Sequence, residues 1–566
     1  MKNHPIEIVR NKLISIVGRK NLYTDPAKTR FYRKGIRVGK GEAFGVVFPK
    51  TLLQLWEVLN VCIAFDKVII MQAANTGLTG GSTPFGSDYD RDIVIINTLN
   101  LDQLVLLNNG TQVIGFPGTT LYQLEKKLSP LGRGPHSVIG SSCIGASVVG
   151  GVCNNSGGNL VNRGPAYTEL SLYARLNNAG ELKLCNHLEI DLGDSPEEIL
   201  TNLQKANFQQ NNLPQSNKMA SDNDYKKRVR DFSSDSPARF NSDKRRLYEA
   251  SGCAGKIAVF AVRLDTFPNP DKQKVFYVGT NKPHQLTLLR EKILAESKYL
   301  PDMGEYIHRS YFDGADKYCK DNFLFIKYLG TEFLPKILFL KRNIDQFFSG
   351  IFFLPDDITD RLLQYFANLL PDHLPRRLRE YRESFEHHML FQASDKGIKS
   401  LEEILEYFAN KYTEFNYIEC DPIEGSDALL HRYVAGAAPA RYKIINSQEA
   451  GDILPLDIAL PRNCHSWHEI ITPDILSKVD VSFQMGHFLC MVFHWDFVVK
   501  KDVDLPKLKK EILTILDVIK AKYPAEHNVG HLYKADKTLE KFYRDLDPTN
   551  TFNSGIGQTS KNKNYL

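Results

Sequence analysis

The stretch GSSCIGASVVGGVCNNSGG, at residues 140–158, decides how the first half of this chain is expected to fold. Glycine recurs through it, with serine, alanine and asparagine in between. A second stretch of the same kind, MQAANTGLTGGS at 71–82, directly follows the strand-like run at 67–70. Side chains this small cannot fill a core, but they let backbone N–H groups approach a large anionic group closely. We therefore predict that the two loops hold the phosphates of one cofactor between them.

Two tight turns with close backbone packing are the alternative explanation of these glycines. The length and the shared composition of the two loops favour phosphate binding by backbone N–H groups and small hydroxyls. Neither loop contains the GK[ST] of a Walker A loop, and neither has the GxGxxG spacing of a Rossmann first turn. The cofactor is therefore not expected on a Rossmann βαβ unit.

The overall composition is that of an ordinary folded protein. The 566 residues are 42% hydrophobic and 24% charged, which leaves room for about two to four domains with a large core. A net charge of +5 is too small for this length to indicate nucleic-acid binding, so no nucleic-acid partner is expected. Nine cysteines, an odd number without any CxxC pair, favour reduced thiols in a cytoplasm-like compartment.

The first eighteen residues have the pattern of an amphipathic helix and not of an export leader. The apolar positions at helical spacing are Ile6, Val9, Leu13 and Ile16. No apolar run in the chain approaches the ~18 residues that a bilayer-spanning helix needs. Any contact with a membrane is therefore expected to be peripheral.

Strands and helices alternate in residues 1 to about 265, joined by glycine-rich turns, which predicts an α+β domain. The polar stretch at 202–246 is predicted to be a long surface excursion, partly mobile. The strand pattern that begins at 276–279 resumes at 483–497, which indicates an insertion within a second domain. The predicted strands of the first part lie at 43–48, 67–71, 92–97, 112–115, 170–176, 181–184 and 256–263, with a helix at 51–65.

The composition changes between residues 308 and 385, where aromatic side chains crowd beside basic clusters. Short amphipathic helices with exposed phenylalanine beside lysine and arginine lie in the membrane interface and meet anionic lipids. An ordinary small aromatic core is the alternative. The residues concerned are Phe323, Phe325, Tyr328, Phe333, Phe339, Phe347, Phe348, Phe352 and Phe353, with Lys336, Lys341, Arg342, Arg376, Arg377, Arg379 and Arg382.

Both glycine loops resemble the FAD-contacting segments of the vanillyl-alcohol oxidase/p-cresol methylhydroxylase (VAO/PCMH) flavoprotein family. Other motifs resemble its bacterial respiratory members, and they extend from about residue 20 to the C-terminus. They are YTDPAKT at 23–29, YRKG at 32–35, DYDRD at 88–92, SGCAGK at 251–256, PAEHNVGHLYKA at 524–535 and DPTN at 547–550. The resemblance is weakest at 202–246 and in the aromatic insert.

The resemblance implies an α+β fold in three parts. A PCMH-type FAD-binding domain would be assembled from residues 1–265 and 518–566. An α+β cap domain with an antiparallel sheet would comprise 266–307, 386–423 and 448–517. A helical membrane-binding insert would comprise 308–385 and 424–447.

The resemblance also implies which residues hold FAD. They come from both loops and from the strand after SGCAGK: Ala73, Ala74, Asn75, Thr76, Gly77, Gly81, Ser82, Gly140, Ser147, Gly157 and Val259. Some members of the family attach FAD covalently through a histidine in the first loop. The loop at 71–82 contains no histidine, so non-covalent FAD is expected.

The implied reaction is the oxidation of D-lactate to pyruvate, with hydride transfer to FAD and electrons passed to a membrane quinone. The substrate carboxylate needs a cation, best a bidentate arginine. The hydroxyl proton needs a base with a pKa near neutral, which histidine supplies most readily. The implied location is the cell inner membrane, peripheral and on the cytoplasmic side, with the segment 308–385 on an anionic lipid surface.

Two alternatives to this function remain open. The nearer one is another FAD-dependent D-2-hydroxy-acid dehydrogenase of the same fold, with a different acid or acceptor. The more distant one is a non-catalytic lipid-surface protein, which would leave the glycine loops and the histidine-rich C-terminal turn without a task.

The catalytic candidates are His487 and His494 in GHFLCMVFH, and Glu526 and His527 in PAEHNVGH, with His494 and His527 favoured for substrate contact. In related dehydrogenases, a histidine pair at this spacing and the glutamate of an EHG motif bind a divalent metal. Here FLCMVF replaces the usual GDGN and EHN replaces EHG, so no metal is assigned. A satisfied core position is the alternative for His487. The HSWHE at 465–469 lacks the HExxH order of a zinc site.

Arg432, in LLHRYVAGAAPARY at 429–442, resembles the arginine that binds the substrate carboxylate in the same relatives. Arg441 is the second choice. An ordinary surface or interdomain ion pair is the alternative for each of them.

Overall fold

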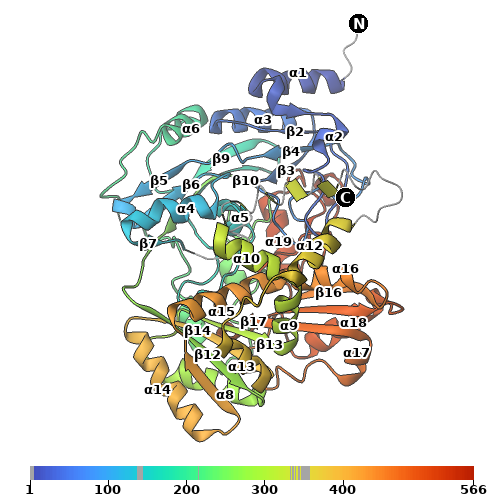
Figure 1. Ribbon diagram of the computed structural model, residues 1–566. Helices are drawn as coiled ribbons and strands as arrows, with labels where there is room; N and C mark the ends of the chain where they lie inside the picture. The colour runs from blue at the N-terminus through green and yellow to red at the C-terminus, as the bar shows by residue number, and fades with distance from the viewer. Residues whose placement is uncertain are drawn as a thin grey trace.

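The computed structural model describes residues 5–136, 145–214, 216–331, 333, 337, 340, 341, 344, 345 and 357–566. The first sheet has the strand order β1-β2-β4-β3, and β2, β4 and β3 are parallel. Alternate residues enter two buried clusters, Val46 and Ile95 in one and Val47 and Ile96 in the other. Burial on both faces explains the continuous apolar runs of these strands. They are β1 Leu22–Tyr23, β2 Gly45–Val47, β3 Val68–Gln72 and β4 Ile93–Asn97, covered by α1 Pro5–Val17 and α3 Leu52–Ala64, with α2 Pro26–Thr29 following β1 (Figure 1).

The second sheet is antiparallel throughout, with the order β5-β6-β10-β8-β9. The register between β10 and β8 shifts between Val259 and Ala261. A shift of this kind is a β-bulge, which bends the strand and re-aims its residues. The strands are β5 Leu104–Leu107, β6 Gln112–Gly115, β8 Ser171–Leu176, β9 Leu182–Asn186 and β10 Ala258–Asp265. The helices of this part are α4 Leu121–Leu128, α5 Val148–Cys153 and α6 Pro196–Gln204, beside the strand pair β7 Arg133–Gly134 and β11 Phe267–Pro268.

The C-terminal segment returns to the N-terminal sheets. Phe552 pairs with Ile69 of β3, and Asn553 donates hydrogen bonds to the carbonyls of Gly81 and Ala254. The ammonium of Lys256, which is completely buried, donates to Asn550 Oδ1 at 2.6 Å and to the Phe552 carbonyl at 2.9 Å. A buried ammonium is costly unless it is paired in this way. The C-terminal segment, which includes the helix α19 Lys537–Leu546, therefore packs against the N-terminal sheets.

A seven-stranded antiparallel sheet forms the other half of the molecule, with the order β15-β12-β14-β13-β17-β18-β16. Successive residues of a strand point to opposite faces. Phe276 accordingly enters one buried cluster and Tyr277 the other. The strands are β12 Gln273–Thr280, β13 Met303–His308, β14 His387–Ser394, β15 Phe415–Glu419, β16 Ala450–Ala459, β17 Val479–His487 and β18 Val492–Lys500.

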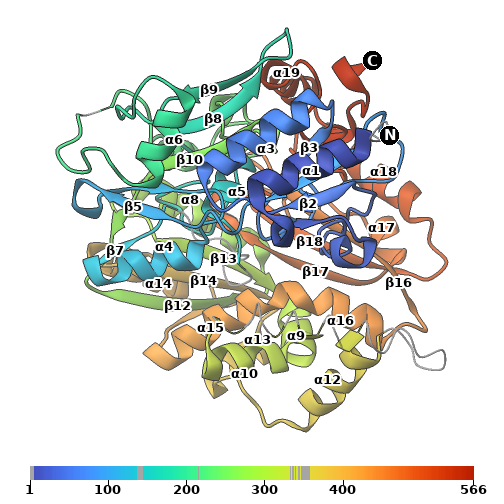
Figure 2. The same ribbon diagram turned by 90° about the horizontal axis from the view of Figure 1, so that it is seen from above.

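Each face of this sheet is covered by its own helices. One face packs against α8 Pro283–Glu296, α14 Lys396–Lys411 and α18 Leu505–Val518. The other packs against α9 Arg309–Tyr318, α10 Lys320–Leu329, α13 Arg376–Ser384, α15 Pro422–Val434 and α16 Ala438–Ile445. Figure 2 shows these latter helices gathered on one side of the molecule together with α12 Ile358–Leu369. The short helix α17 Pro473–Ser477 precedes β17.

The prediction of a surface excursion at 202–246 is wrong for its second half. The helix α7 Tyr225–Arg230 lies there, and Tyr225 and Arg239 are buried. Arg228 and Arg246 both form ion pairs with Asp222, whose side chain is fully buried. Because these charges neutralise each other, a polar composition that is typical of a surface loop can enter the interior.

Exposed apolar residues mark the helical insert. Leu362, Phe366 and Leu369 share one side of α12, and Phe366 and Leu369 are 60% and 67% exposed. Within the described part of the chain, none of the helices combines the length and the apolarity that crossing a bilayer requires. Of the residues named for the membrane prediction, Lys336, Phe339, Arg342, Phe347, Phe348, Phe352 and Phe353 lie outside the described residues.

Candidate active site

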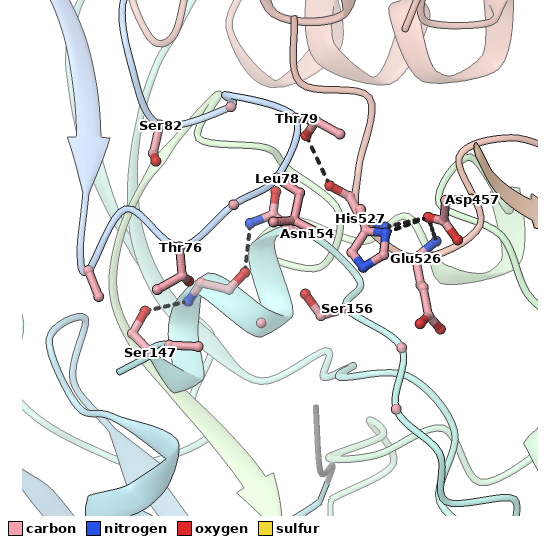
Figure 3. A pocket seen from close by; sticks show the side chains of 18 of the residues that line it. Thr76, Leu78, Thr79, Ser82, Ser147, Asn154, Ser156, Asp457, Glu526 and His527 are labelled. Atoms are coloured by element: carbon pink, nitrogen blue, oxygen red, sulfur yellow. Dashed lines mark hydrogen bonds and ion pairs between the residues drawn. The ribbon is translucent and has the colours of Figure 1, made fainter. Parts of the chain in front are cut away.

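A cavity of about 740 Å³ lies where the two N-terminal sheets meet the seven-stranded sheet. Residues of both glycine loops line it, and Figure 3 shows Thr76, Ser82 and Ser147 around it. The predicted cofactor residues that line the cavity are Ala73, Ala74, Asn75, Thr76, Gly77, Gly81, Ser82, Ser147, Gly157 and Val259. Gly140 lies outside the described residues.

The two loops approach each other at the wall of this cavity. A Cβ added at Gly145 would lie 3.8 Å from the Cβ of Ala74. Asn75 adopts a left-handed conformation, with φ 54°, and its side chain accepts a hydrogen bond from Ser82 Oγ at 2.8 Å. Asparagine tolerates this conformation better than most residues. The first loop is thus folded back on itself and faces the second loop across one shared space.

The residues present fit a diphosphate-bearing cofactor. No heavy atom lies within 4 Å of a Cβ added at Gly77, so the backbone there opens onto the cavity. The hydroxyl of Ser147 accepts from the Gly150 N–H at 3.0 Å, which leaves its own O–H as a donor. Val259 lines the cavity beside the bulge in β10. Backbone and hydroxyl donors without a nearby lysine are a suitable set for backbone-mediated phosphate binding.

Glycine is required at position 157 for a different reason. A Cβ at this position would lie 1.9 Å from Glu526 Oε2. Gly157 therefore admits the Glu526 carboxylate, which no other residue at this position would allow without movement of one of the two segments.

Glu526 is the centre of a cluster of charged side chains on the cavity wall. Its Oε1 lies 3.2 Å from His487 Nε2 and 3.3 Å from His494 Nε2. Its Oε2 lies 2.5 Å from Arg239 Nη2. His487 Nδ1 lies 2.7 Å from Glu305 Oε1. The strands β13, β17 and β18 supply Glu305, His487 and His494, the loop at 524–535 supplies Glu526, and the segment after α7 supplies Arg239. Glu305 and His487 are paired directly in the sheet register.

Charge compensation fixes the protonation of this cluster. Burial would raise the pKa of Glu526, but Arg239 and His487 hold the pKa of this carboxyl well below its usual range. Burial lowers the pKa of His487, but the carboxylates of Glu305 and Glu526 outweigh it and raise the pKa to about 10. His487 is therefore charged at neutral pH, and Glu526 is a carboxylate.

A second pair consists of Asp457 and His527 (Figure 3). Asp457 Oδ2 lies 2.9 Å from His527 Nδ1 and accepts the backbone N–H groups of Glu526 and His527 at 2.9 and 3.1 Å. Burial lowers the pKa of His527, but Asp457 and Glu526 together raise it above its ordinary value. His494 Nδ1 lies 3.6 Å from Asp457 Oδ1, so His494 bridges the two pairs.

The predicted arginines lie in different places. Arg432 lines the cavity, and its Nη2 lies 2.8 Å from Glu305 Oε2. Arg441 forms ion pairs with Asp321 and Asp360, both at 3.2 Å, and is not among the residues that line the cavity. In the HSWHE segment, Trp467 is a core residue.

Known protein families and proteins resemble this chain over nearly its whole length. A model described as "FAD binding domain" matches residues 43–179, and one described as "D-lactate dehydrogenase, membrane binding" matches residues 275–565. The quinone-dependent D-lactate dehydrogenase of Escherichia coli (strain K12) is 54% identical over 98% of this chain and 97% of its own. That of Haemophilus influenzae is 52% identical over 98% of this chain and 98% of its own. That of Corynebacterium glutamicum is 40% identical over 97% of this chain and 96% of its own.

This chain belongs to the quinone-dependent D-lactate dehydrogenase family. As a member it is an FAD-dependent oxidoreductase, so the predicted enzyme class and cofactor are confirmed.

Among solved structures, p-cresol methylhydroxylase with substrate bound matches with a TM-score of 0.59 at 12% identity, over 99% of this chain and 98% of its own. Alkyldihydroxyacetonephosphate synthase matches with a TM-score of 0.58 at 12% identity, over 98% of this chain and 85% of its own. These likenesses confirm the predicted VAO/PCMH-type fold. The membrane-binding model supports membrane association of this D-lactate dehydrogenase.

Three members of the charged cluster in this D-lactate dehydrogenase are not among the residues predicted from the sequence. Arg239 lies in the stretch assigned to the surface, Glu305 in a strand without a motif, and Asp457 in another. One signal was present: Asp457 interrupts the apolar run LPLDIAL, and an ionised residue in a buried strand needs a partner.

Two groups of side chains in the described part of the chain have the spacing of metal ligands. They are His487, His494 and Glu526, and Asp457, His494 and His527, with the ligand atoms of each group within 4.8 Å of one another. A dication in the first group would lie beside the guanidinium of Arg239 and displace the proton of His487. The assignment of no metal stays a prediction.

Proposed function

We propose that this enzyme oxidises D-lactate to pyruvate and passes the electrons to a quinone dissolved in the membrane. The observation that carries the proposal is the shared cavity, because the two glycine loops line one part of it and the histidine–carboxylate cluster another. Its relatives of 40–54% identity are named for this reaction. The alternative is a different 2-hydroxy acid or acceptor in the same cavity.

The glycine loops would hold FAD without a covalent bond. The donors proposed are the backbone N–H groups at Ala73, Ala74 and Gly77 and the hydroxyls of Thr76 and Ser147, which all belong to cavity-lining residues. The backbone of Val259 would contact the flavin. Bound FAD would supply the acceptor for the C2 hydride of the substrate and the redox link to the quinone.

His527 is the proposed base for the substrate hydroxyl. Its Nδ1 is held by Asp457 at 2.9 Å, which leaves Nε2 to take up a proton. A carboxylate that holds the far nitrogen of a histidine fixes the tautomer and stabilises the imidazolium that forms. His494, which contacts both Asp457 and Glu526, is the second candidate.

His487 has a different task in this proposal. With its pKa raised to about 10 it cannot accept a proton at neutral pH, but it can stabilise negative charge on the substrate oxygen. Glu526 and Glu305 hold it from both sides. Arg432 stays a candidate for the substrate carboxylate, although Glu305 already compensates its charge.

The part of the protein proposed to contact the membrane is the helical insert. The exposed apolar residues of α10 and α12 would enter the interface, and the arginines of α13 would meet anionic headgroups on the cytoplasmic side of the inner membrane.

We propose the same three-part division of the chain as the sequence suggests. The FAD-binding domain would comprise 1–265 and 518–566, and the cap domain 266–307, 386–423 and 448–517. The membrane-binding insert would comprise 308–385 and 424–447.

An anaerobic titration of the holoenzyme tests the proposal. D-Lactate is expected to bleach the flavin absorbance, L-lactate and D-2-hydroxyglutarate to bleach it far more slowly, and a short-chain quinone to restore it. Faster bleaching by D-2-hydroxyglutarate would favour the alternative substrate. A flavin that D-lactate leaves oxidised would overturn the proposal.

A further inference from the structure

The cavity wall carries few cations, and most are already neutralised. Among the described residues, Arg37 and Arg432 are the arginines that line it, and no lysine does. Arg432 is ion-paired with Glu305 at 2.8 Å. Arg37 has no ion pair with any described residue, and its one hydrogen bond within the described part of the chain runs from Nη2 to the carbonyl of Gly436 at 3.3 Å. A guanidinium has five donors, so most of those of Arg37 remain available.

The rest of the cavity wall is unfavourable to an anion. The acidic residues that line it are Glu305, Asp457, Asp496 and Glu526. The histidines near them are already bound to these carboxylates: His487 lies between Glu305 and Glu526, and His527 contacts Asp457. Asp496 has a neutral partner, the hydroxyl of Tyr311 at 2.7 Å. A carboxylate substrate must therefore be met by a cation whose charge is not already used.

Arg37 is held at this place by its loop. A Cβ added at Gly35 would lie 2.0 Å from the Val38 carbonyl oxygen, and one at Gly39, whose φ is +98°, would lie 3.2 Å from the Cα of Gly80. The tight turn is thus packed directly on the first glycine loop. From there, Arg37 reaches across to Gly436, which follows α15. It spans the two parts of the molecule that enclose the cavity.

The position of Arg37 also agrees with its electrostatic effect. Burial lowers the pKa of His527, Asp457 raises it, and the charge of Arg37 lowers it again. The charge of Arg37 is therefore near enough to the proposed base to act on its pKa.

We propose that Arg37 forms the subsite for the carboxylate of a small 2-hydroxy monoacid, between its loop and the turn at Gly436. This inference rests on the proposed function, because it names how that reaction's substrate is recognised. Arg37 would bind the carboxylate with its unused N–H donors while the substrate hydroxyl faces His527. Arg432 would instead hold Glu305, and through it His487.

The test compares an acid with its neutral isostere. The kcat/KM for anaerobic flavin bleaching is measured with D-lactate and with D-lactamide, in wild type, Arg37→Met, Arg37→Lys, Arg432→Met and the control Lys40→Met. Arg37→Met is expected to lose about 100-fold in kcat/KM for D-lactate, as for a lost charge-assisted contact. D-Lactamide should change less than threefold. Arg37→Lys should recover part of the loss, and Lys40→Met, a charge removed from the same exposed turn, should resemble wild type.

A second measurement keeps the proposal falsifiable if D-lactamide does not react. The Kd of oxamate, which also carries a carboxylate, is measured from the perturbation of the flavin spectrum, and Arg37→Met should weaken it by a similar factor. The proposal is wrong if Arg37→Met keeps either the preference for D-lactate over D-lactamide or the affinity for oxamate. It is also wrong if that preference and that affinity are lost in Arg432→Met and not in Arg37→Met. Loss of bleaching in wild type would instead contradict the proposed function.

Discussion

Arg239 Nη2 lies 2.5 Å from Glu526 Oε2, although 287 positions separate the two residues in the chain. The guanidinium also donates to the Gly158 carbonyl at 2.8 Å. It therefore links the second glycine loop, the histidine cluster and a segment whose composition is that of a surface loop. Because both side chains are buried, neither charge can be left alone without a large cost.

Removal of Arg239 should destabilise the protein more than removal of an exposed arginine. Arg239→Met leaves the Glu526 carboxylate buried beside the Gly158 carbonyl without its guanidinium, which should cost about 3 kcal/mol of the free energy of unfolding. The matched control is Arg376→Met, which breaks a pair with Glu380 in which the arginine is 91% and the glutamate 53% exposed, and it should change this free energy by less than about 0.5 kcal/mol. Denaturant unfolding of the holoenzyme measures both. Equal losses in the two variants would contradict the role given to Arg239.

The rate of flavin reduction should rise with pH if His527 is the base. Asp457 and Glu526 raise the pKa of His527 above 6.5 against the effect of burial. Below that raised value the base is protonated, so kcat/KM should fall about tenfold for each pH unit. His527→Gln should lose this limb and about 10²–10⁴-fold in rate. Stopped-flow bleaching by D-lactate from pH 5 to 9 gives the profile. An unchanged profile in the variant would transfer the role to another group, His494 first.

Stability should decline at alkaline pH because of His487. Its pKa is raised from 6.5 to about 10 by Glu305 and Glu526 against burial, so the folded state binds the proton more tightly than the unfolded state does. The resulting stabilisation is fully present below about pH 6.5 and is lost as pH rises through 10. One pKa unit corresponds to about 1.4 kcal/mol, so a shift from 6.5 to about 10 places on the order of 5 kcal/mol at stake.

The variant His487→Asn should flatten this alkaline decline. His465→Asn, at a side chain that is 67% exposed, should keep it. Thermal unfolding of both variants between pH 6 and 10 checks the prediction, and a decline of wild-type steepness in His487→Asn would refute it.

Removal of divalent metals should leave activity nearly intact. The group formed by His487, His494 and Glu526 has the spacing of metal ligands. However, Glu526 is already bound by Arg239, and His487 keeps its proton to about pH 10. A dication would have to compete with both positive charges. Dialysis against a chelator should change D-lactate oxidation by less than about twofold, with metal content checked by mass spectrometry. Activity that disappears and returns on addition of one metal ion would establish a metal site instead.

Membrane binding should depend on the exposed face of α12. Phe366 and Leu369, which are 60% and 67% exposed, lie on one side of this helix, and their removal from water stabilises the bound state by about 1.5–3 kcal/mol each. The double variant Phe366→Ser, Leu369→Ser should therefore bind anionic vesicles at least about tenfold more weakly in sedimentation. Val518→Ser, at an exposed apolar residue on α18, is the control. Undiminished sedimentation of the double variant would place the contact elsewhere.

The two glycine loops could be predicted from the sequence because their property is local. Small side chains within twelve to nineteen consecutive residues allow a close backbone approach whatever the rest of the chain does. The strands before them were predicted for a similar reason, since burial on both faces demands an unbroken apolar run, as in β4 Ile93–Asn97. The family motifs added the cofactor, and the comparisons agree with them.

The pairing of charges was decided by the tertiary structure alone. Nothing near Arg432 in sequence shows that Glu305 compensates its charge, and nothing near Arg239 shows that it enters the interior to meet Glu526. Such pairs form between residues more than a hundred positions apart, and each is stable only because the fold excludes water from both partners at once. The sequence by itself therefore determined which backbone could approach a cofactor. Only the folded chain decided which of its charges were neutralised and which, like that of Arg37, remained available in the cavity.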